Sequence, residues 1–287
     1  MQTPLAQMIA LTCCGNAAIH GKQVPQFFPN NSTCQFCESI TFIAGEKSKG
    51  REAQSVAFAD SPDRWIEGLS KRGVIGLKLH QRAQNQSQIS DRMSSGFVGG
   101  GRLWRIEAMR RDSSSEFWLS KWEVGNQNSP DRKIWRVTYG LCEVSKTVQM
   151  TLRNLDEIIA DLRLALNAIH SFSETNNCVN FTACFANALR ALDEPKADIG
   201  YHKDLFPPGT FANAAQSILK SAMSAWVFGG MGSWNDMGFE GESQKEYEQI
   251  SDTLFNVLNE AVEAAATRPY RHIVSGATKR KRGRRGL

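Results

Sequence analysis

The sequence predicts an α+β protein in which an antiparallel β-meander of three or more strands is followed by a C-terminal half with four helices. Two periodicities support this prediction. Apolar and polar residues alternate along residues 102–146, and from residue 152 onward apolar residues recur every three or four positions. The first pattern indicates strands with one buried face, and the second indicates amphipathic helices. Because the strands precede the helices, the alternating order of a parallel α/β protein is not expected.

Composition divides the chain into four parts. Residues 1–50 contain cysteines, prolines and short polar clusters and are expected to be irregular. Residues 51–147 form a β-rich part that contains the meander, residues 148–267 are helical, and residues 268–287 form a basic, disordered tail. With 41% apolar and 22% charged residues among 287, the chain has enough apolar side chains to bury a core.

Membrane and secreted classes do not fit the composition. No stretch reaches the roughly 18–20 consecutive apolar residues that a membrane span needs, so no membrane partner is expected. The N-terminus lacks the basic residues that open a signal peptide. The seven cysteines are odd in number and do not have the spacing of a secreted disulfide framework. We therefore expect a cytoplasmic location, or a nuclear one if the chain is eukaryotic.

Three alternating segments make up the predicted meander, at residues 102–111, 116–125 and 133–145. The stretches between them are rich in serine, asparagine and aspartate, which favour turns. The opposite face carries charges of both signs, which predicts cross-strand ion pairs rather than an anion-binding surface. The residues expected on the buried face are Trp104, Ile106, Ala108, Trp118, Trp122, Val124, Trp135, Val137, Tyr139 and Leu141.

Four apolar stripes indicate the helices. They begin at Leu152, Phe181, Phe211 and Tyr247, and each continues at intervals of three and four residues. Every stripe covers one face of a helix, so each helix needs a partner surface. Four such helices joined by short loops predict a bundle, or a helical layer packed on the meander.

Cys34 and Cys37 form a CxxC pair, the spacing with which zinc knuckles hold a metal ion. Cys13 and His20 are further side chains of suitable chemistry, so one interpretation is a zinc site built from these four residues. A second CxxC pair is missing. The competing interpretation is a pair of partly buried thiols beside Phe36. Zinc is the one cofactor that the sequence suggests.

A glycine-rich stretch at residues 226–241 lies between the third and fourth predicted helices. Gly230, Gly232, Ser233 and Trp234 are candidate ligand-binding residues, because glycine-rich loops can present backbone N–H groups to an anion. The stretch follows a helix, however, and the negative end of the helix dipole repels anions. The competing interpretation is a helix cap and a rigid joint between the two helices.

Polar residues in two loops are candidates for catalysis. His202 and Asp204 lie in a proline-bounded loop, and Asn235 and Asp236 follow the glycines. If folding brings them together, His202 has the chemistry of a general base. The sequence has no fingerprint of a serine hydrolase, a zinc protease or a nucleotide-binding loop. The leading interpretation is therefore a non-catalytic binding or interaction protein. The alternative is an enzyme of unknown class with a polar site near His202 and the glycine-rich loop 229–241.

The charge of the chain is concentrated at its C-terminal end. The chain has 34 basic and 29 acidic residues, and six of the basic ones lie in the last nine positions. These six are Lys279, Arg280, Lys281, Arg282, Arg284 and Arg285. The remainder is close to neutral, so the tail is the segment expected to contact nucleic acid or an acidic protein. The competing interpretation is a solvated terminal extension. A protein partner for the folded body is also compatible with the sequence.

Overall fold

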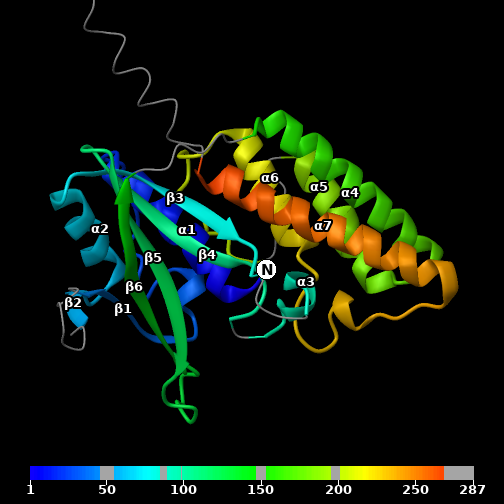
Figure 1. Ribbon diagram of the computed structural model, residues 1–287, viewed down its shortest axis with the longest axis horizontal. Coiled ribbons are helices and arrows are strands. Elements are labelled where there is room, and N and C mark those ends of the chain that lie inside the picture. Colours follow the sequence, from blue (N-terminus) through cyan, green and yellow to red (C-terminus); the bar gives the residue numbers. More distant parts are fainter. Residues whose placement is uncertain (46–54, 85–88, 98, 147–152, 195–200, 268–287) are drawn as a thin grey trace, which may run out of the picture.

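The computed structural model describes residues 1–45, 55–84, 89–97, 99–146, 153–194 and 201–267. Within these residues the chain forms seven α-helices and one six-stranded mixed sheet, and its organisation is α+β overall. Figure 1 shows the sheet with one helix running behind it and a group of long helices beside it. No helix in the described part of the chain has both the length and the apolar character needed to cross a membrane.

The sheet combines parallel and antiparallel pairing. Its strand order is β2-β1-β6-β5-β4-β3. The strands are β1 (Cys37–Gly45), β2 (Ser55–Ala59), β3 (Val74–Arg82), β4 (Leu103–Arg110), β5 (Ser114–Val124) and β6 (Trp135–Lys146). β1 runs parallel to β6, and the other neighbouring pairs are antiparallel.

The predicted order, a meander followed by four helices, is wrong. Helices α1 (Thr3–Ile19), α2 (Pro62–Lys71) and α3 (Asp91–Ser94) are interspersed with the strands, and a mixed six-stranded sheet takes the place of the antiparallel meander. The parallel pairing of β1 with β6 joins segments that are far apart in the sequence, such as Ile40 and Val137. Alternation of apolar residues indicates which face of a strand is buried, but it does not identify the neighbouring strand.

Helix α1 is buried on every side. Every residue from Leu5 to Ala17 is buried, and the helix packs against β3, β4, α2 and α7. The prediction that residues 1–50 are irregular is therefore wrong for Thr3–Ile19, which form a helix. A helix enclosed by protein needs no polar face, so it lacks the three-to-four-residue period by which amphipathic helices are recognised.

Aromatic side chains fill the space between the sheet and α2. Phe42 of β1 stacks on Trp65 of α2 with ring centroids 4.6 Å apart, and on Tyr139 of β6 at 5.1 Å. Trp118 of β5 meets Trp65 edge-on at 5.8 Å. Offset and edge-on pairs of this kind contribute about 0.5–1.5 kcal/mol each beyond the area that they bury. This cluster joins the parallel and antiparallel parts of the sheet to one helix.

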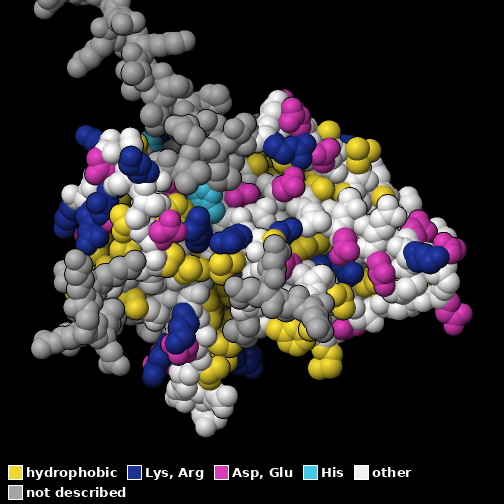
Figure 2. All heavy atoms as spheres, viewed as in Figure 1, with side chains coloured by type: hydrophobic (Ala, Val, Ile, Leu, Met, Phe, Trp, Pro, Cys, Tyr) yellow, Lys and Arg dark blue, Asp and Glu magenta, His cyan; other side chains and the backbone are white. Residues whose placement is uncertain are grey.

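The expected faces of the strands are confirmed for most positions. Trp104 is almost completely buried, and Ile106 and Ala108 are fully buried. Val124 is exposed instead, because the hairpin formed by β5 and β6 extends beyond the body at its tip (Figure 1). On the opposite face cross-strand ion pairs occur as expected, for example between Arg105 and Glu143 at 3.0 Å. Figure 2 shows basic and acidic side chains interspersed over the sheet.

The remaining helices form a bundle. They are α4 (Leu155–Thr175), α5 (Val179–Asp193), α6 (Asn213–Ala225) and α7 (Gly241–Thr267). The predicted apolar stripes face the interior, since Leu162, Phe185, Ile218 and Leu254 are all fully buried. Trp234, in a short 3-10 helix η2 (Trp234–Asp236), lies among them and is also fully buried.

Side chains from two helices cover the outer edge of β3. Asn16 of α1 accepts a hydrogen bond from the N–H of Leu77 at 2.7 Å and donates to its carbonyl at 2.9 Å. Thr267, the last residue of α7, does the same at Leu79, at 3.2 and 3.3 Å. A third N–H of this edge donates to Glu263 of α7 at 3.1 Å. The edge strand is thus satisfied without another strand, and α1 and α7 are tied to it.

Replacing Asn16 should destabilise the whole fold. We expect Asn16→Leu to lower the free energy of unfolding by about 2–4 kcal/mol, because the N–H and C=O of Leu77 would both be buried without partners and each such group costs about 1–3 kcal/mol. Urea denaturation measures the change. Asn180→Leu, at an exposed position of α5, is the matched control and should stay within about 0.5 kcal/mol of the parent. Equal midpoints for the two variants would contradict the role given to Asn16.

Candidate ligand-binding cleft

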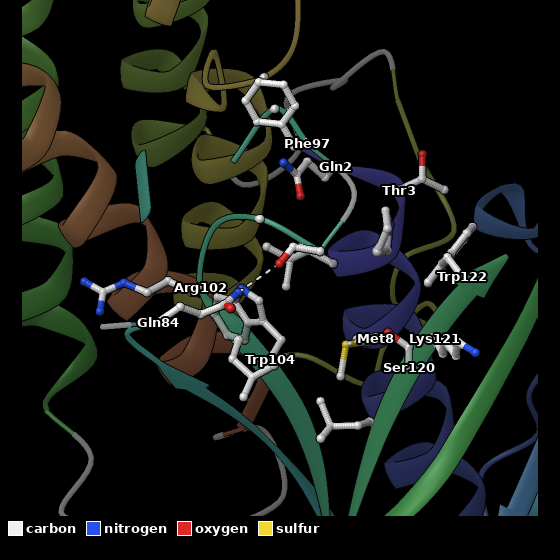
Figure 3. Close-up of a pocket in the computed structure, with 18 of the residues that line it drawn as sticks. Gln2, Thr3, Met8, Gln84, Phe97, Arg102, Trp104, Ser120, Lys121 and Trp122 are labelled. Atoms are coloured by element: carbon white, nitrogen blue, oxygen red, sulfur yellow. Dashed lines mark hydrogen bonds between the residues drawn. The ribbon is translucent and has the colours of Figure 1, made fainter. Parts of the chain in front are cut away.

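A cleft opens where β4 and β5 separate. Their ladder runs from the Met109–Ser115 pair to the Ile106–Trp118 pair and ends there. Residues 103–105 of β4 and 119–124 of β5 therefore border a gap, and Figure 3 shows the two strands diverging with the first turns of α1 between them. The cavity has a volume of about 490 Å³, which is in the range of ordinary ligand pockets.

Apolar and aromatic side chains form most of the walls. Trp104 and Trp122 stand on opposite sides of the cleft in Figure 3, with Met8 of α1 between them. Trp135 of β6 also lines the cleft and meets Trp122 edge-on, with ring centroids 6.0 Å apart. Because tryptophan offers a large and rigid contact surface, these walls suit a ligand with an apolar body.

Two loops complete the lining, one that follows α3 and one that follows α6. Their backbones touch, because a Cβ atom placed on Gly96 would lie 2.2 Å from the carbonyl oxygen of Gly229. The amide of Gln84 holds the first loop by donating to the carbonyls of Gly99 at 3.0 Å and Gly101 at 2.9 Å. The position of each loop therefore depends on the other.

The charged side chains of the lining are both cationic. They are Arg102 and Lys121, and no carboxylate, imidazole or thiol belongs to the described lining. Arg102 lies 3.4 Å from Asp91 and donates to Asn256 at 2.7 Å, so its position is fixed. The side chain of Lys121 is 71% exposed and lies 2.8 Å from Glu123. Each cation already has a carboxylate beside it, so Asp91 and Glu123 partly offset the positive field that an anionic group on a ligand would meet in the cleft.

The N-terminal end of α1 adds to this field. Gln2, Thr3 and Pro4 line the cleft. Among the described residues no side chain caps this end of the helix, and its first turn contains no acidic residue. The first N–H groups of a helix and the positive end of its dipole both favour a nearby negative charge.

One of the four residues predicted to bind a ligand lines this cleft. Gly230 belongs to its lining, whereas Gly232 and Ser233 line a smaller depression beside it. Trp234 is enclosed by the helical bundle, where its Nε1 donates to Ser251 Oγ at 2.7 Å. The later part of the glycine-rich loop is therefore a joint between helices, and only its beginning reaches the cleft.

His202 and Asp204 lie together beside Ser32. The Ser32 hydroxyl lies 2.9 Å from Nδ1 of His202 and donates to the Asp204 carboxylate, which also accepts from the Ser32 N–H at 2.7 Å. Burial lowers the pKa of His202. Here the serine lies between the histidine and the carboxylate, whereas nucleophilic catalysis places the histidine between the other two. The contacts anchor this loop to the 3-10 helix η1 (Ser32–Cys34).

Asn235 and Asp236 have a different set of partners. The Asn235 amide accepts from Arg92 Nη1 at 3.1 Å and donates to the Arg92 carbonyl at 2.9 Å. Asp236 accepts from the N–H groups of Gly232 and Ser233, which completes a capping box at η2. Within the described part of the chain, the four candidate catalytic residues thus form two groups that share no hydrogen-bond partner.

The cysteines near the N-terminus are packed as apolar groups. Cys13, Cys34 and Cys37 are buried, and burial raises the pKa of Cys34 to about 12 and that of Cys37 to about 11. His20 uses Nδ1 to contact the carbonyl of Asn16 at 2.9 Å. In the described ranges no group of three or more histidine, cysteine or acidic side chains is placed to hold a metal ion. The zinc prediction therefore has no supporting cluster there.

A further polar cluster lies on the sheet face opposite α1. Glu107 is fully buried, accepts from Ser115 Oγ at 2.6 Å and lies 2.6 Å from His80 Nε2. Burial acts to raise the pKa of Glu107, but the hydrogen bonds with His80 and Ser115 outweigh it and hold the pKa below its usual value. The carboxylate occupies the centre of this group, so the cluster joins β3, β4 and β5 rather than activating the serine.

Sequence patterns do not predict the cleft. Its tryptophans, Trp104, Trp122 and Trp135, are expected only as members of a buried face, and the available signal was the glycine-rich segment that directly precedes β4. The six basic residues of the predicted tail lie outside the described residues. Comparison of the chain with protein families, with curated proteins and with solved structures found no match.

The contact between the two loops gives a test of the cleft's architecture. We expect Gly96→Ala to lower stability by about 1–3 kcal/mol, because its methyl group would overlap the carbonyl of Gly229 and force the loops apart. Thermal unfolding measures this change. Gly238→Ala is the control, since a Cβ atom there meets nothing within 4 Å. An unchanged melting temperature for Gly96→Ala would show that the loops do not pack as described.

Proposed function

We propose that this chain is a non-catalytic binding protein whose cleft between β4 and β5 takes up a ligand with an apolar body and an anionic group. The composition of the cleft is the observation that carries the proposal. Tryptophans stand on both sides, Arg102 and Lys121 lie in the lining, and the described lining has no carboxylate, imidazole or thiol. A carboxylate or imidazole usually serves as the base that activates a hydroxyl nucleophile, and Thr3 and Ser120 have no such group beside them in the described lining. Aromatic walls and cations are sufficient for binding.

The enzymatic alternative has weaker support. It needs His202 and Asp204 to act together with Asn235 and Asp236, and the two pairs are bonded to different partners. His202 and Asp204 are engaged in fixing a loop to η1. Neither pair belongs to the described lining of the cleft.

The cleft should distinguish an apolar anion from its neutral counterpart. We expect 8-anilinonaphthalene-1-sulfonate to bind more tightly than N-phenyl-1-naphthylamine, which has the same aromatic body without the sulfonate. Trp122→Ala should weaken both probes by about 1–3 kcal/mol, because it removes a large aromatic contact. Lys121→Glu should reduce the preference for the sulfonate. Fluorescence titration at fixed ionic strength measures the affinity of each probe for the parent and for both variants.

Two outcomes would count against this proposal. The first is a sulfonate affinity that none of the cleft substitutions changes, because the probe would then bind elsewhere. The second is the absence of saturable binding by either probe. Val144→Ala, at an exposed position of β6 outside the lining, is the matched control and should bind both probes like the parent.

The basic tail adds a second proposed partner, a nucleic acid or an acidic protein. The support is its composition alone, with six basic residues in nine positions. We expect deletion of residues 279–287 to weaken retardation of a short DNA duplex and to make the logarithmic salt dependence of binding shallower, because each lost phosphate contact removes about 0.9 from that slope. Competition between polyglutamate and the DNA duplex tests whether the tail binds an acidic protein instead. Unchanged retardation with an unchanged slope would contradict the role of the tail.

A further inference from the structure

Two unpaired strand edges border the cleft, and this sets it apart from a simple pocket. Residues 103–105 of β4 pair with β3 alone, and residues 119–124 of β5 pair with β6 alone. All of these residues belong to the described part of the chain. On the cleft side both strands therefore carry N–H and C=O groups that no ladder uses. An edge of this kind is a template for an added strand, and several peptide-binding domains use it in this way.

The surroundings of the gap match the alternating side chains of an extended peptide. Successive side chains of a strand point to opposite faces of a sheet. One set would meet Met8 of α1 together with Trp104 and Trp122. The other set would face the side from which Lys121 projects, since Lys121 alternates with its neighbours Ser120 and Trp122 along β5. Ser120 points towards α1, with its hydroxyl 3.9 Å from the sulfur of Met8.

Charge decides between the available occupants. The C-terminal tail of this chain is strongly basic, and it would bring positive charge beside Arg102 and Lys121. Like charges placed together at an interface oppose binding. A segment that carries a carboxylate is complementary to Lys121 of the lining, whose side chain is 71% exposed and whose surface ion pair with Glu123 a ligand carboxylate can share.

On the basis of the proposed function, we infer that the ligand is an extended segment of a partner protein that inserts as a strand between β4 and β5. This segment has apolar side chains at alternate positions and at least one carboxylate among the others. Its backbone hydrogen bonds to the two open edges provide affinity, and the tryptophan-lined floor and Lys121 select its side chains.

A peptide array tests the inference with the full chain. Its members are acetylated and amidated octapeptides with Val, Leu, Phe or Trp at alternate positions and Asp, Ser or Lys at the others. Fluorescence anisotropy should show saturable binding for members with aspartate and about fivefold weaker binding for their lysine counterparts. Methylation of alternate backbone nitrogens should weaken the best binder at least about tenfold in each of the two registers, because each register removes the donors to one of the two edges. The absence of any binder, or affinity that is insensitive to methylation in either register, would overturn the inference.

Substitutions in the cleft test whether the peptide binds there. Trp122→Ala should weaken peptide binding at least about tenfold, and Val144→Ala should leave it unchanged. Lys121→Glu changes an exposed side chain and should reverse the preference between aspartate and lysine peptides, so it remains decisive if Trp122→Ala does not fold. Retention of the parental preference in Lys121→Glu would overturn the assignment of the cleft.

The outcomes separate this inference from the proposed function. Saturable binding of 8-anilinonaphthalene-1-sulfonate in the cleft without any peptide binder would overturn the inference and leave the proposed function in place. If neither 8-anilinonaphthalene-1-sulfonate nor any peptide binds, the inference and the proposed function are both overturned. Sedimentation equilibrium tests a second copy of the chain as the occupant. A dimer that dissociates in both Trp122→Ala and Lys121→Glu would replace the partner protein by the chain itself and overturn the inference.

Discussion

The open edge of β3 is the constraint on which the architecture depends. Along an edge strand, alternate residues direct their N–H and C=O groups away from the sheet, and when buried these groups need partners. Asn16 and Thr267 supply both a donor and an acceptor, and Glu263 supplies an acceptor. These side chains come from α1 at the start of the described chain and from α7 at its end. These contacts therefore tie the sheet to α1 and to helix α7 of the bundle.

Polar side chains help to fix the position of α1, in addition to the packing of its buried apolar residues. Gln7 accepts from the hydroxyl of Tyr139 at 3.0 Å and donates to the carbonyl of Thr33 at 3.3 Å. Asn16 is held at β3 nine residues later, about 13 Å along the helix axis. Apolar packing alone would tolerate small rotations and shifts of the helix, whereas two sets of buried hydrogen bonds do not. The N-terminal turn of α1 is thereby placed against one side of the gap between β4 and β5.

The sequence predicts the parts of the fold that periodicity encodes. The buried faces at Trp104 and Leu162 follow from local alternation and from a helical stripe, and both are observed. Helix α1 leaves no such signal, because it is buried on all sides and has no separate polar face. The parallel pairing of β1 with β6 is set by tertiary contacts between distant segments. Among the residues that line the cleft, only Gly230 is predicted to bind a ligand. The cleft forms where the ladder between two strands ends, and the sequence of a single strand does not show where its pairing ends.

A β-bulge lies at the point where the cleft begins. In the β5–β6 ladder Phe117 pairs with Glu143 and Trp118 with Leu141, so Cys142 is left over, and its thiol donates to the carbonyl of Phe117 at 3.2 Å. The ladder between β4 and β5 ends at the same Trp118. A bulge increases the local twist of a strand pair and bends it, which turns the distal part of the β5–β6 hairpin away from β4.

An open edge of this kind promotes uncontrolled association unless it is protected. Here α1 closes the gap from one side, and Lys121 adds a charge at the edge, which is a common protection of edge strands. The loops around Gly96 and Gly229 restrict the gap further. We assign the selection of one extended chain of suitable charge to the same features that prevent indiscriminate strand pairing. In this proposal, protection of the edge and selection of a partner rest on the same residues.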